Sequence, residues 1–213
     1  MAITKDYLNT NDVNVFAAWM QANLVPDYFA AVTVENAAVT CTDADGNTLL
    51  TISWGTTGGG NLVLTFNAYK SGSYATTFSR GSISVCQYCA SCANGALVVW
   101  KATNGDNMQQ ALLITKTNNG KTALIFAGEN LYSTTLCIAW GDVAPDSTYS
   151  FTPLTANQTQ LVPFCTDAAL STPSYTPDAF YIPVGQYYSM GIGKLALDGT
   201  TYLTNGYWAI KDE

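Results

Sequence analysis

The pattern of apolar and polar positions predicts one helix, near the start of the chain. Thr10 or Asn11 can cap its first turn, and Pro26 stops it. Such a helix either packs on the body of the protein or forms an arm that docks into a neighbouring subunit. Apolar residues recur at the spacing of one helical face at Val13, Phe16, Ala17, Met20 and Leu24.

From Phe29 onward the pattern predicts β-strands. Runs rich in β-branched and aromatic residues alternate with turns rich in Gly, Asn, Asp and Ser. Two hairpin turns are well marked, at residues 43–47 and 118–120, because Asn and Gly accept the positive φ that tight hairpins require. Short strands at this spacing favour a sandwich or barrel. The predicted strands are 31–35, 38–42, 48–54, 61–69, 82–88, 96–103, 111–117, 122–127 and 135–140.

Residues 143–186 differ from the rest of the chain. They hold six of the seven prolines, and no Lys or Arg occurs between Lys121 and Lys194. Proline lacks the ladder donor, so this segment is predicted to be edge strand or extended arm. Its large apolar residues need a surface, and we expect a homo-oligomer. The alternative is an arm that wraps its own domain in a monomer. The predicted interface anchors are Phe151, Phe164, Phe180 and Tyr181.

The end of the chain regains β character. Residues 194–197, 201–203 and 207–210 predict a small meander with a turn at Asp198-Gly199. The predicted fold is therefore mainly β, with a sandwich or jelly-roll-like body, one N-terminal helix and a Pro-rich extended segment. The predicted divisions are 1–142 (helix and β body), 143–186 (Pro-rich segment) and 187–213 (meander, packed on the same domain).

Composition narrows the possible functions. The 213 residues are 48% hydrophobic but only 11% charged, with a net charge of −7 and one arginine, Arg80. Nucleic-acid binding and adhesion to an anionic membrane both need clustered cations, so neither is expected. No apolar run approaches the roughly 20 residues that span a bilayer, so membrane insertion is not expected either. The first residues lack the basic start and apolar stretch of a secretory signal. We expect synthesis in the cytosol without a signal peptide.

The chain contains no histidine, which removes Ser-His-Asp and Cys-His nucleophile arrangements and every His-ligated metal site. Glu35 and Glu129 are the internal glutamates, and a carboxylate pair can hydrolyse glycosides, but nothing in the sequence brings them together. We predict no catalytic residue, no enzyme activity and no cofactor.

Cys86, Cys89 and Cys92 form the sharpest local motif, with two consecutive CxxC spacings. Such spacing suits a zinc or iron–sulfur knuckle, or a disulfide within the cluster. The favoured interpretation is free cysteines that act as small apolar residues, as expected in a reducing cytosol. We therefore expect no required metal. A fourth metal ligand would have to be Cys41, Cys137 or Cys165.

Aromatic residues support a second hypothesis. Tyr187 and Tyr188 lie beside the predicted turn at 184–186, and Trp208 lies near the end of the chain. Exposed aromatic rings on a β scaffold stack against sugars, which suggests a glycan- or receptor-binding module. The alternative for these residues is core packing, because Trp and Tyr bury much apolar area.

Three stretches carry a resemblance to a known group of proteins. They are residues 112–123 (LLITKTNNGKTA), 150–157 (SFTPLTAN) and 198–212 (DGTTYLTNGYWAIKD). Together they resemble small structural proteins of tailed phages and prophages of gut bacteria, mainly over residues 108–213. The resemblance implies a virion component, such as a head decoration, neck or tail protein, that associates with itself and with other virion proteins. It also implies synthesis in a bacterial cytosol, assembly into the virion and a trimer in preference to a dimer. It carries over no functional residue.

Overall fold

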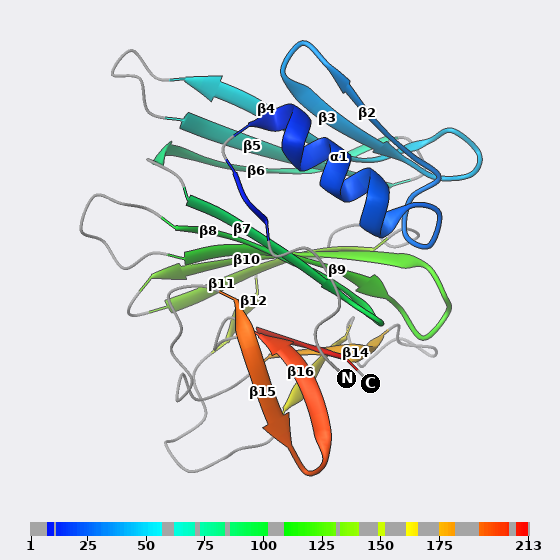
Figure 1. The fold of residues 1–213 in the computed structure, drawn as a ribbon, viewed down its shortest axis with the longest axis vertical. Coiled ribbons are helices and arrows are strands. Elements are labelled where there is room, and N and C mark those ends of the chain that lie inside the picture. The colour runs from blue at the N-terminus through cyan, green and yellow to red at the C-terminus, as the bar shows by residue number, and fades with distance from the viewer. Residues whose placement is uncertain are drawn as a thin grey trace.

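The computed structural model contains one helix and seventeen strands in the residues that it describes (Figure 1). The prediction of a mainly β protein with one N-terminal helix is confirmed. The described residues are 8–10, 12–56, 62–70, 73–83, 86–101, 109–130, 133–140, 149–151, 161–165, 175–181, 192–204 and 208–212.

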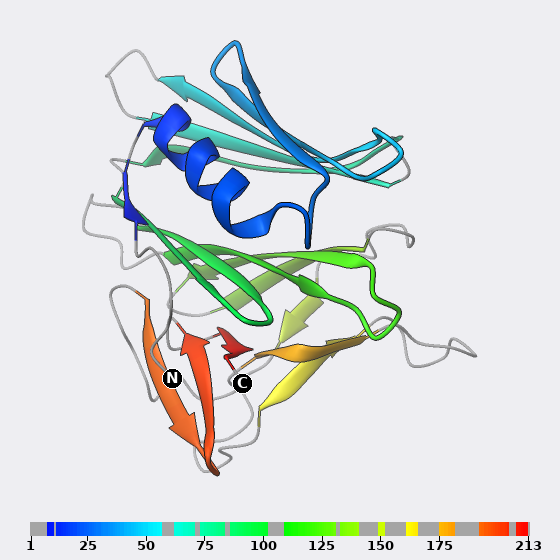
Figure 2. The same cartoon turned by 45° about the vertical axis from the view of Figure 1, so that its right-hand side comes forward.

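The strands form three antiparallel sheets that lie one above another (Figures 1 and 2). The first sheet has the order β2 (Ala31–Glu35), β3 (Ala38–Thr42), β4 (Thr48–Thr56), β5 (Leu62–Lys70) and β6 (Ser73–Ile83). The central sheet has the order β1 (Leu8–Asn9), β7 (Cys86–Cys92), β8 (Gly95–Lys101), β9 (Gln109–Lys116), β10 (Thr122–Asn130), β11 (Ser133–Trp140) and β12 (Tyr149–Phe151). The third sheet has the order β13 (Val162–Cys165), β14 (Tyr175–Tyr181), β17 (Trp208–Lys211), β16 (Thr200–Thr204) and β15 (Gly193–Leu197).

The topology is that of a layered sandwich and not of a jelly roll. Strands β2 to β6 are neighbours in chain order, and so are β7 to β12. A jelly roll instead folds two Greek keys across two sheets, so that its chain repeatedly changes sheet. Antiparallel pairing of successive strands keeps each of these two runs within one sheet.

The N-cap of helix α1 (Val13–Leu24) is Asp12, and not Thr10 or Asn11 as predicted. The Asp12 carboxylate accepts hydrogen bonds from the backbone N–H groups of Asn14, at 2.8 Å, and Val15, at 3.4 Å. The Thr10 hydroxyl accepts instead from the Asp12 N–H at 3.0 Å, and Asn11 lies outside the described residues. Asp12 is the cap because its side chain reaches the second and third N–H groups of the helix.

The helix packs on the body of its own chain, between the first and central sheets (Figure 2). It ends at Leu24, and Val25 is already extended before Pro26, as the sequence predicted. Its buried face comprises Phe16, Ala17, Trp19, Met20 and Leu24.

The central sheet is buried on both faces. Along β8, Ala96 and Val98 pack into the first core, which also holds the helix, whereas Leu97 and Val99 pack into a second core against the third sheet. Successive side chains of a strand point to opposite faces, so a strand between two cores must be apolar at every position. The uninterrupted apolar run of β8 is therefore the sequence signature of the middle layer.

Two stretches differ from their predicted structure. Residues 73–83 form the long strand β6, which the sequence analysis did not predict, because its Ser- and Thr-rich composition lacks regular apolar alternation. The strand predicted at 82–88 is divided in the structure: residues 82–83 end β6, and β7 runs from Cys86 to Cys92.

The described parts of the Pro-rich segment 143–186 pair with strands of the same chain. β12 and β13 are edge strands, as predicted for a proline-containing stretch. β14 departs from that expectation, because it pairs with β13 on one side and β17 on the other. Pro177 is accommodated there because the register between β13 and β14 shifts between Pro163 and Cys165.

Candidate functional site

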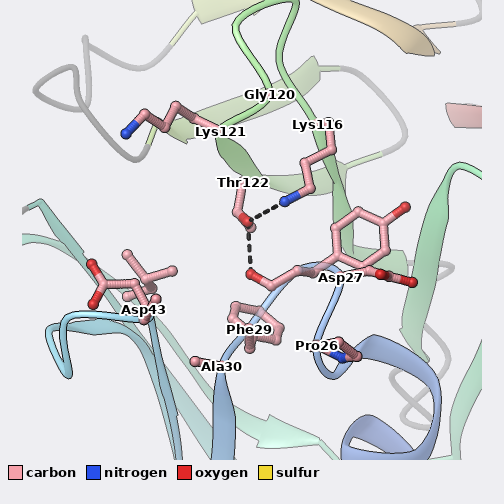
Figure 3. Close-up of a pocket in the computed structure, with 12 residues that line it drawn as sticks. Pro26, Asp27, Phe29, Ala30, Asp43, Lys116, Gly120, Lys121 and Thr122 are labelled. Atoms are coloured by element: carbon pink, nitrogen blue, oxygen red, sulfur yellow. Dashed lines mark hydrogen bonds between the residues drawn. The ribbon is translucent and has the colours of Figure 1, made fainter.

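A cavity of about 230 Å³ lies where the first and central sheets meet the end of α1 (Figure 3). Its walls come from three segments: the α1–β2 connection, the β3–β4 turn and the β9–β10 hairpin. The residues that determine its chemistry are Asp27, Tyr28, Asp43, Lys116, Lys121 and Thr122.

The β9–β10 hairpin sets one wall. Gly120 has a φ of +74°, and its N–H donates to the Thr117 carbonyl at 2.8 Å. The Thr117 N–H donates to the Lys121 carbonyl, also at 2.8 Å, which closes the turn. This geometry is the one that the Asn-Asn-Gly sequence predicted. It places Lys116 and Lys121 on the two sides of one tight turn.

The hairpin is also tied to the third sheet. The Asn118 N–H donates to the Tyr175 carbonyl at 2.8 Å, and the Tyr175 N–H donates to Asn118 Oδ1 at 3.1 Å. The wall that carries the two lysines is therefore held by the start of β14 as well as by its own turn.

The β3–β4 turn sets the opposite wall. Asp43 Oδ1 accepts from the N–H groups of Asp45, at 3.0 Å, and Asn47, at 2.8 Å, and Oδ2 accepts from the Asn47 side chain at 3.1 Å. Desolvation acts to raise the pKa of Asp43, but the hydrogen bonds from Asn47 and Asp45 and the charge of Lys121 outweigh it and lower the pKa. The Asp43 carboxylate is thus engaged in holding its own turn.

Lys116 lies at the middle of the cavity (Figure 3). Its Nζ donates to Thr122 Oγ1 at 3.4 Å and lies 5.2 Å from the centre of the Tyr28 ring, within cation–π range. Thr122 Oγ1 in turn donates to the Tyr28 carbonyl at 2.7 Å, so its lone pairs are left to accept from the ammonium. Partial burial lowers the pKa of Lys116, and the charge of Asp27 acts in the opposite direction.

The Lys116 ammonium is held by uncharged groups. Among the described residues, no carboxylate oxygen lies within ion-pair distance of its Nζ. Burial also raises the pKa of the Tyr28 phenol well above its usual value, so Tyr28 is a neutral wall of the cavity. A partly desolvated cation beside a hydroxyl and an aromatic ring can bind an anion.

Two of the three cysteines of the CxxC motif, Cys89 and Cys92, lie on opposite faces of the central sheet. Cys89 is fully buried in the first core, whereas Cys92 packs against the second core, with its Sγ 3.7 Å from the Lys211 carbonyl oxygen. Residues three apart in a strand lie on opposite faces of the sheet, so these two thiols cannot share one ion in this arrangement. Burial raises the pKa of Cys92 to about 12. Cys86 lies in β7, but its side chain is outside the described residues. Within the described part of the chain, no group of three or more Cys, Asp or Glu side chains is placed to hold a metal ion.

Trp208 corrects one residue of the glycan hypothesis. Its side chain is 0% exposed and packs in the second core, so it cannot stack on a sugar at the surface. Tyr187 and Tyr188 lie outside the described residues. Glu35 is exposed at the end of β2, and the side chain of Glu129 in β10 is outside the described part.

The predicted interface anchors lie in strands of the chain's own sheets. Phe180 is half-buried and packs edge-on against Tyr202, with ring centres 5.9 Å apart. Phe151 belongs to β12, Phe164 to β13 and Tyr181 to β14, but their side chains are outside the described residues.

Sequence reasoning found the hairpin turn but not the cavity. The tight turn at 118–120 is a local signal, and a lysine on each side of it was visible in the sequence. The proximity of these lysines to Tyr28 depends on how two sheets pack together, and no local sequence pattern predicts it.

Fold and site together define an all-β protein of three stacked sheets, with a small polar cavity between two of them. Comparisons of the chain with protein families, curated proteins and solved structures gave no match. The one helix of the described residues, α1, is too short to cross a membrane.

Proposed function

We propose that this protein is a structural component of a bacteriophage or prophage particle and that it works by self-association and by contacts with other particle proteins. The resemblance of residues 108–213 to small virion proteins supports the assignment to a particle. The low charge content supports the mode of action, because it reduces repulsion between neighbouring subunits.

The observation that carries self-association is the contrast between β6 and the other sheet edges. Natural proteins protect such edges by shortness, proline, lysine or a covering side chain. β1 and β12 have two and three residues, β13 contains Pro163, and β15 contains Lys194. In β2, the Val32 N–H is covered by Gln21 Oε1 at 3.2 Å.

Strand β6 lacks the first three of these protections. It is eleven residues long, contains no proline, and has Arg80 as its one charged residue. Among the described strands it pairs with β5 on one side and with no strand on the other. A long and nearly uncharged edge is a template for the strand of another chain, so β6 is the proposed site of self-association.

The partner edge decides the symmetry. Two β6 strands that pair with each other form a two-fold dimer, whereas β6 paired with a different edge of the next subunit forms a ring. A trimer, as expected from the virion resemblance, requires the second arrangement. The predicted anchors Phe151, Phe164, Phe180 and Tyr181 would then add side-chain contacts from the central and third sheets.

Adjacent proline substitutions in β6 test the edge. N–H groups of consecutive residues in an edge strand point alternately toward the neighbouring strand and away from it. Of Thr76→Pro and Thr77→Pro, one therefore removes an outward donor and the other a donor to β5. We expect light scattering at micromolar concentration to show an oligomer of the 22.7 kDa chain. One variant should be a folded monomer and the other should lose stability. A monomeric wild type, or two folded variants that both keep the oligomer mass, would contradict the role of β6.

Association with a particle is tested separately. Mass spectrometry of particles purified from an induced lysogen that carries this gene should detect the protein at a constant ratio to the major capsid or tail proteins. Its absence from washed particles, or flanking genes unrelated to virion assembly, would refute the assignment.

A further inference from the structure

We propose that the cavity around Lys116 is a binding site for a small ligand with a single carboxylate, of the size of one sugar acid. The inference is independent of the particle role, because it rests on the first and central sheets of a single chain.

The position of the cations and carboxylates supports an anion. Lys116 Nζ points to the middle of the cavity, where it meets the Thr122 hydroxyl and the Tyr28 ring. Figure 3 shows the carboxylates of Asp27 and Asp43 on opposite outer sides, away from this ammonium. The ammonium has three donors, and Thr122 accepts one of them. A ligand carboxylate that accepts from the two remaining N–H donors of Lys116 would give the partly desolvated charge the charged partner that the described protein residues do not provide.

The charge balance of the walls favours one negative charge over two. Lys116 and Lys121 are matched by Asp27 and Asp43, so the lining has no net charge. Lys121 acts on Asp43 and Asp27 acts on Lys116, but of the two lysines it is Lys116 whose ammonium points to the middle of the cavity, where a ligand would lie. A doubly charged phosphate would therefore face the repulsion of two aspartates with one cation to offset it.

The volume of the cavity and its remaining lining residues indicate what the uncharged part of the ligand should be. A volume of about 230 Å³ is smaller than the roughly 300–1,000 Å³ of drug-sized sites, so the cavity fits one ring. Pro26, Phe29 and Leu49 supply apolar lining, and Asp27 can accept hydrogen bonds from hydroxyl groups. Apolar faces with peripheral hydroxyls and one carboxylate are the chemistry of a sugar acid.

The test uses glucuronate as the probe, with glucose as the uncharged analogue and inorganic phosphate as the competing anion. Binding to the full chain is followed by NMR chemical-shift changes at constant ionic strength. We expect glucuronate to bind at millimolar concentration, glucose and phosphate to bind at least tenfold more weakly, and Lys116→Met to weaken glucuronate at least tenfold. Lys194→Met, which changes an exposed lysine of β15 in the third sheet, is the matched control and should bind as the wild type does.

A second measurement keeps the proposal testable if Lys116→Met does not fold. Glucuronate should slow the reductive methylation of Lys116 in the wild-type protein at least threefold and leave that of Lys194 unchanged. Equal binding of phosphate and glucuronate would overturn the preference for a carboxylate. No shift with glucuronate, or no protection of Lys116, would overturn the site itself.

Discussion

Among the described glycines, Gly95 is the one at which an added methyl group should lower the free energy of unfolding the most. It begins β8 with a φ of +154°, which residues with a side chain rarely adopt. A Cβ at Gly95 would lie 2.2 Å from the Ile114 carbonyl oxygen of β9, far inside the 3.4–4 Å of ordinary contact. The Cβ would also lie 3.4 Å from Ile210 Cδ1 in the third sheet. The substitution Gly95→Ala must therefore push β8 away from β9 within the central sheet.

The cost has two parts. The backbone conformation contributes about 1–3 kcal/mol for a residue with a side chain. Forcing a methyl group into a packed position contributes about 1–3 kcal/mol more. Gly95→Ala should therefore lower the free energy of unfolding by about 2–6 kcal/mol, a large part of the roughly 5–15 kcal/mol typical of a domain.

Gly120→Ala is the matched control. Gly120 also has a positive φ, of +74°, but a Cβ there would meet nothing within 4 Å. It should cost only the left-handed conformation, about 1–2 kcal/mol. The entropy that alanine removes from the unfolded chain is common to both variants and cancels in their difference. Urea denaturation followed by tryptophan fluorescence gives both values. If Gly95→Ala and Gly120→Ala destabilise equally, the close approach of β8 and β9 is wrong.

Three further predictions follow from single residues. Asp12→Ala should cost about 1 kcal/mol in urea denaturation through loss of the α1 cap, and an unchanged midpoint would show that the cap is not used. Ala37→Gly should stabilise the protein by about 1 kcal/mol, because Ala37 holds a φ of +58° in the β2–β3 turn, and destabilisation would contradict that turn. The free energy of unfolding should fall as pH rises above about 9. Burial raises the folded-state pKa of Cys92 from 9.0 to about 12, so the unfolded chain loses this proton first. Cys92→Ala should reduce the fall measured between pH 8 and pH 10.5, and a fall equal to that of the wild type would exclude this thiol as a cause.

The helix, the hairpin turns and most strands were predictable because their signals are local. The apolar spacing over residues 13–24 defines one face of a helix. Pro26 marks the end of that helix, because proline cannot continue it. Strands β2 and β3 have the predicted bounds, since β-branched runs bordered by turn residues leave few alternatives. Strand β6 was missed because its polar sequence carries no strand signal of its own. It is a strand because it pairs with β5.

The role of individual side chains was less predictable. The strand predicted at 82–88 stops short of Cys89 and Cys92, so the sequence assigned neither thiol to a face of a sheet. In the structure β7 continues to Cys92, and strand alternation then separates Cys89 from Cys92. The sequence favoured core packing for Trp208 but left a surface role open, and only the third sheet packed against the central one decides that it is buried.

Local sequence patterns were enough for most of the elements: one amphipathic helix, most of the short strands and the tight hairpin turns. Which face of each strand is buried follows from the packing of the sheets, because burial depends on the layer that covers that face. The cavity is the clearest case. Tyr28 follows the helix and Lys116 ends β9, and no local rule relates them. They meet because the first sheet packs on the central sheet over a shared apolar core, and the polar ends of that contact enclose the cavity.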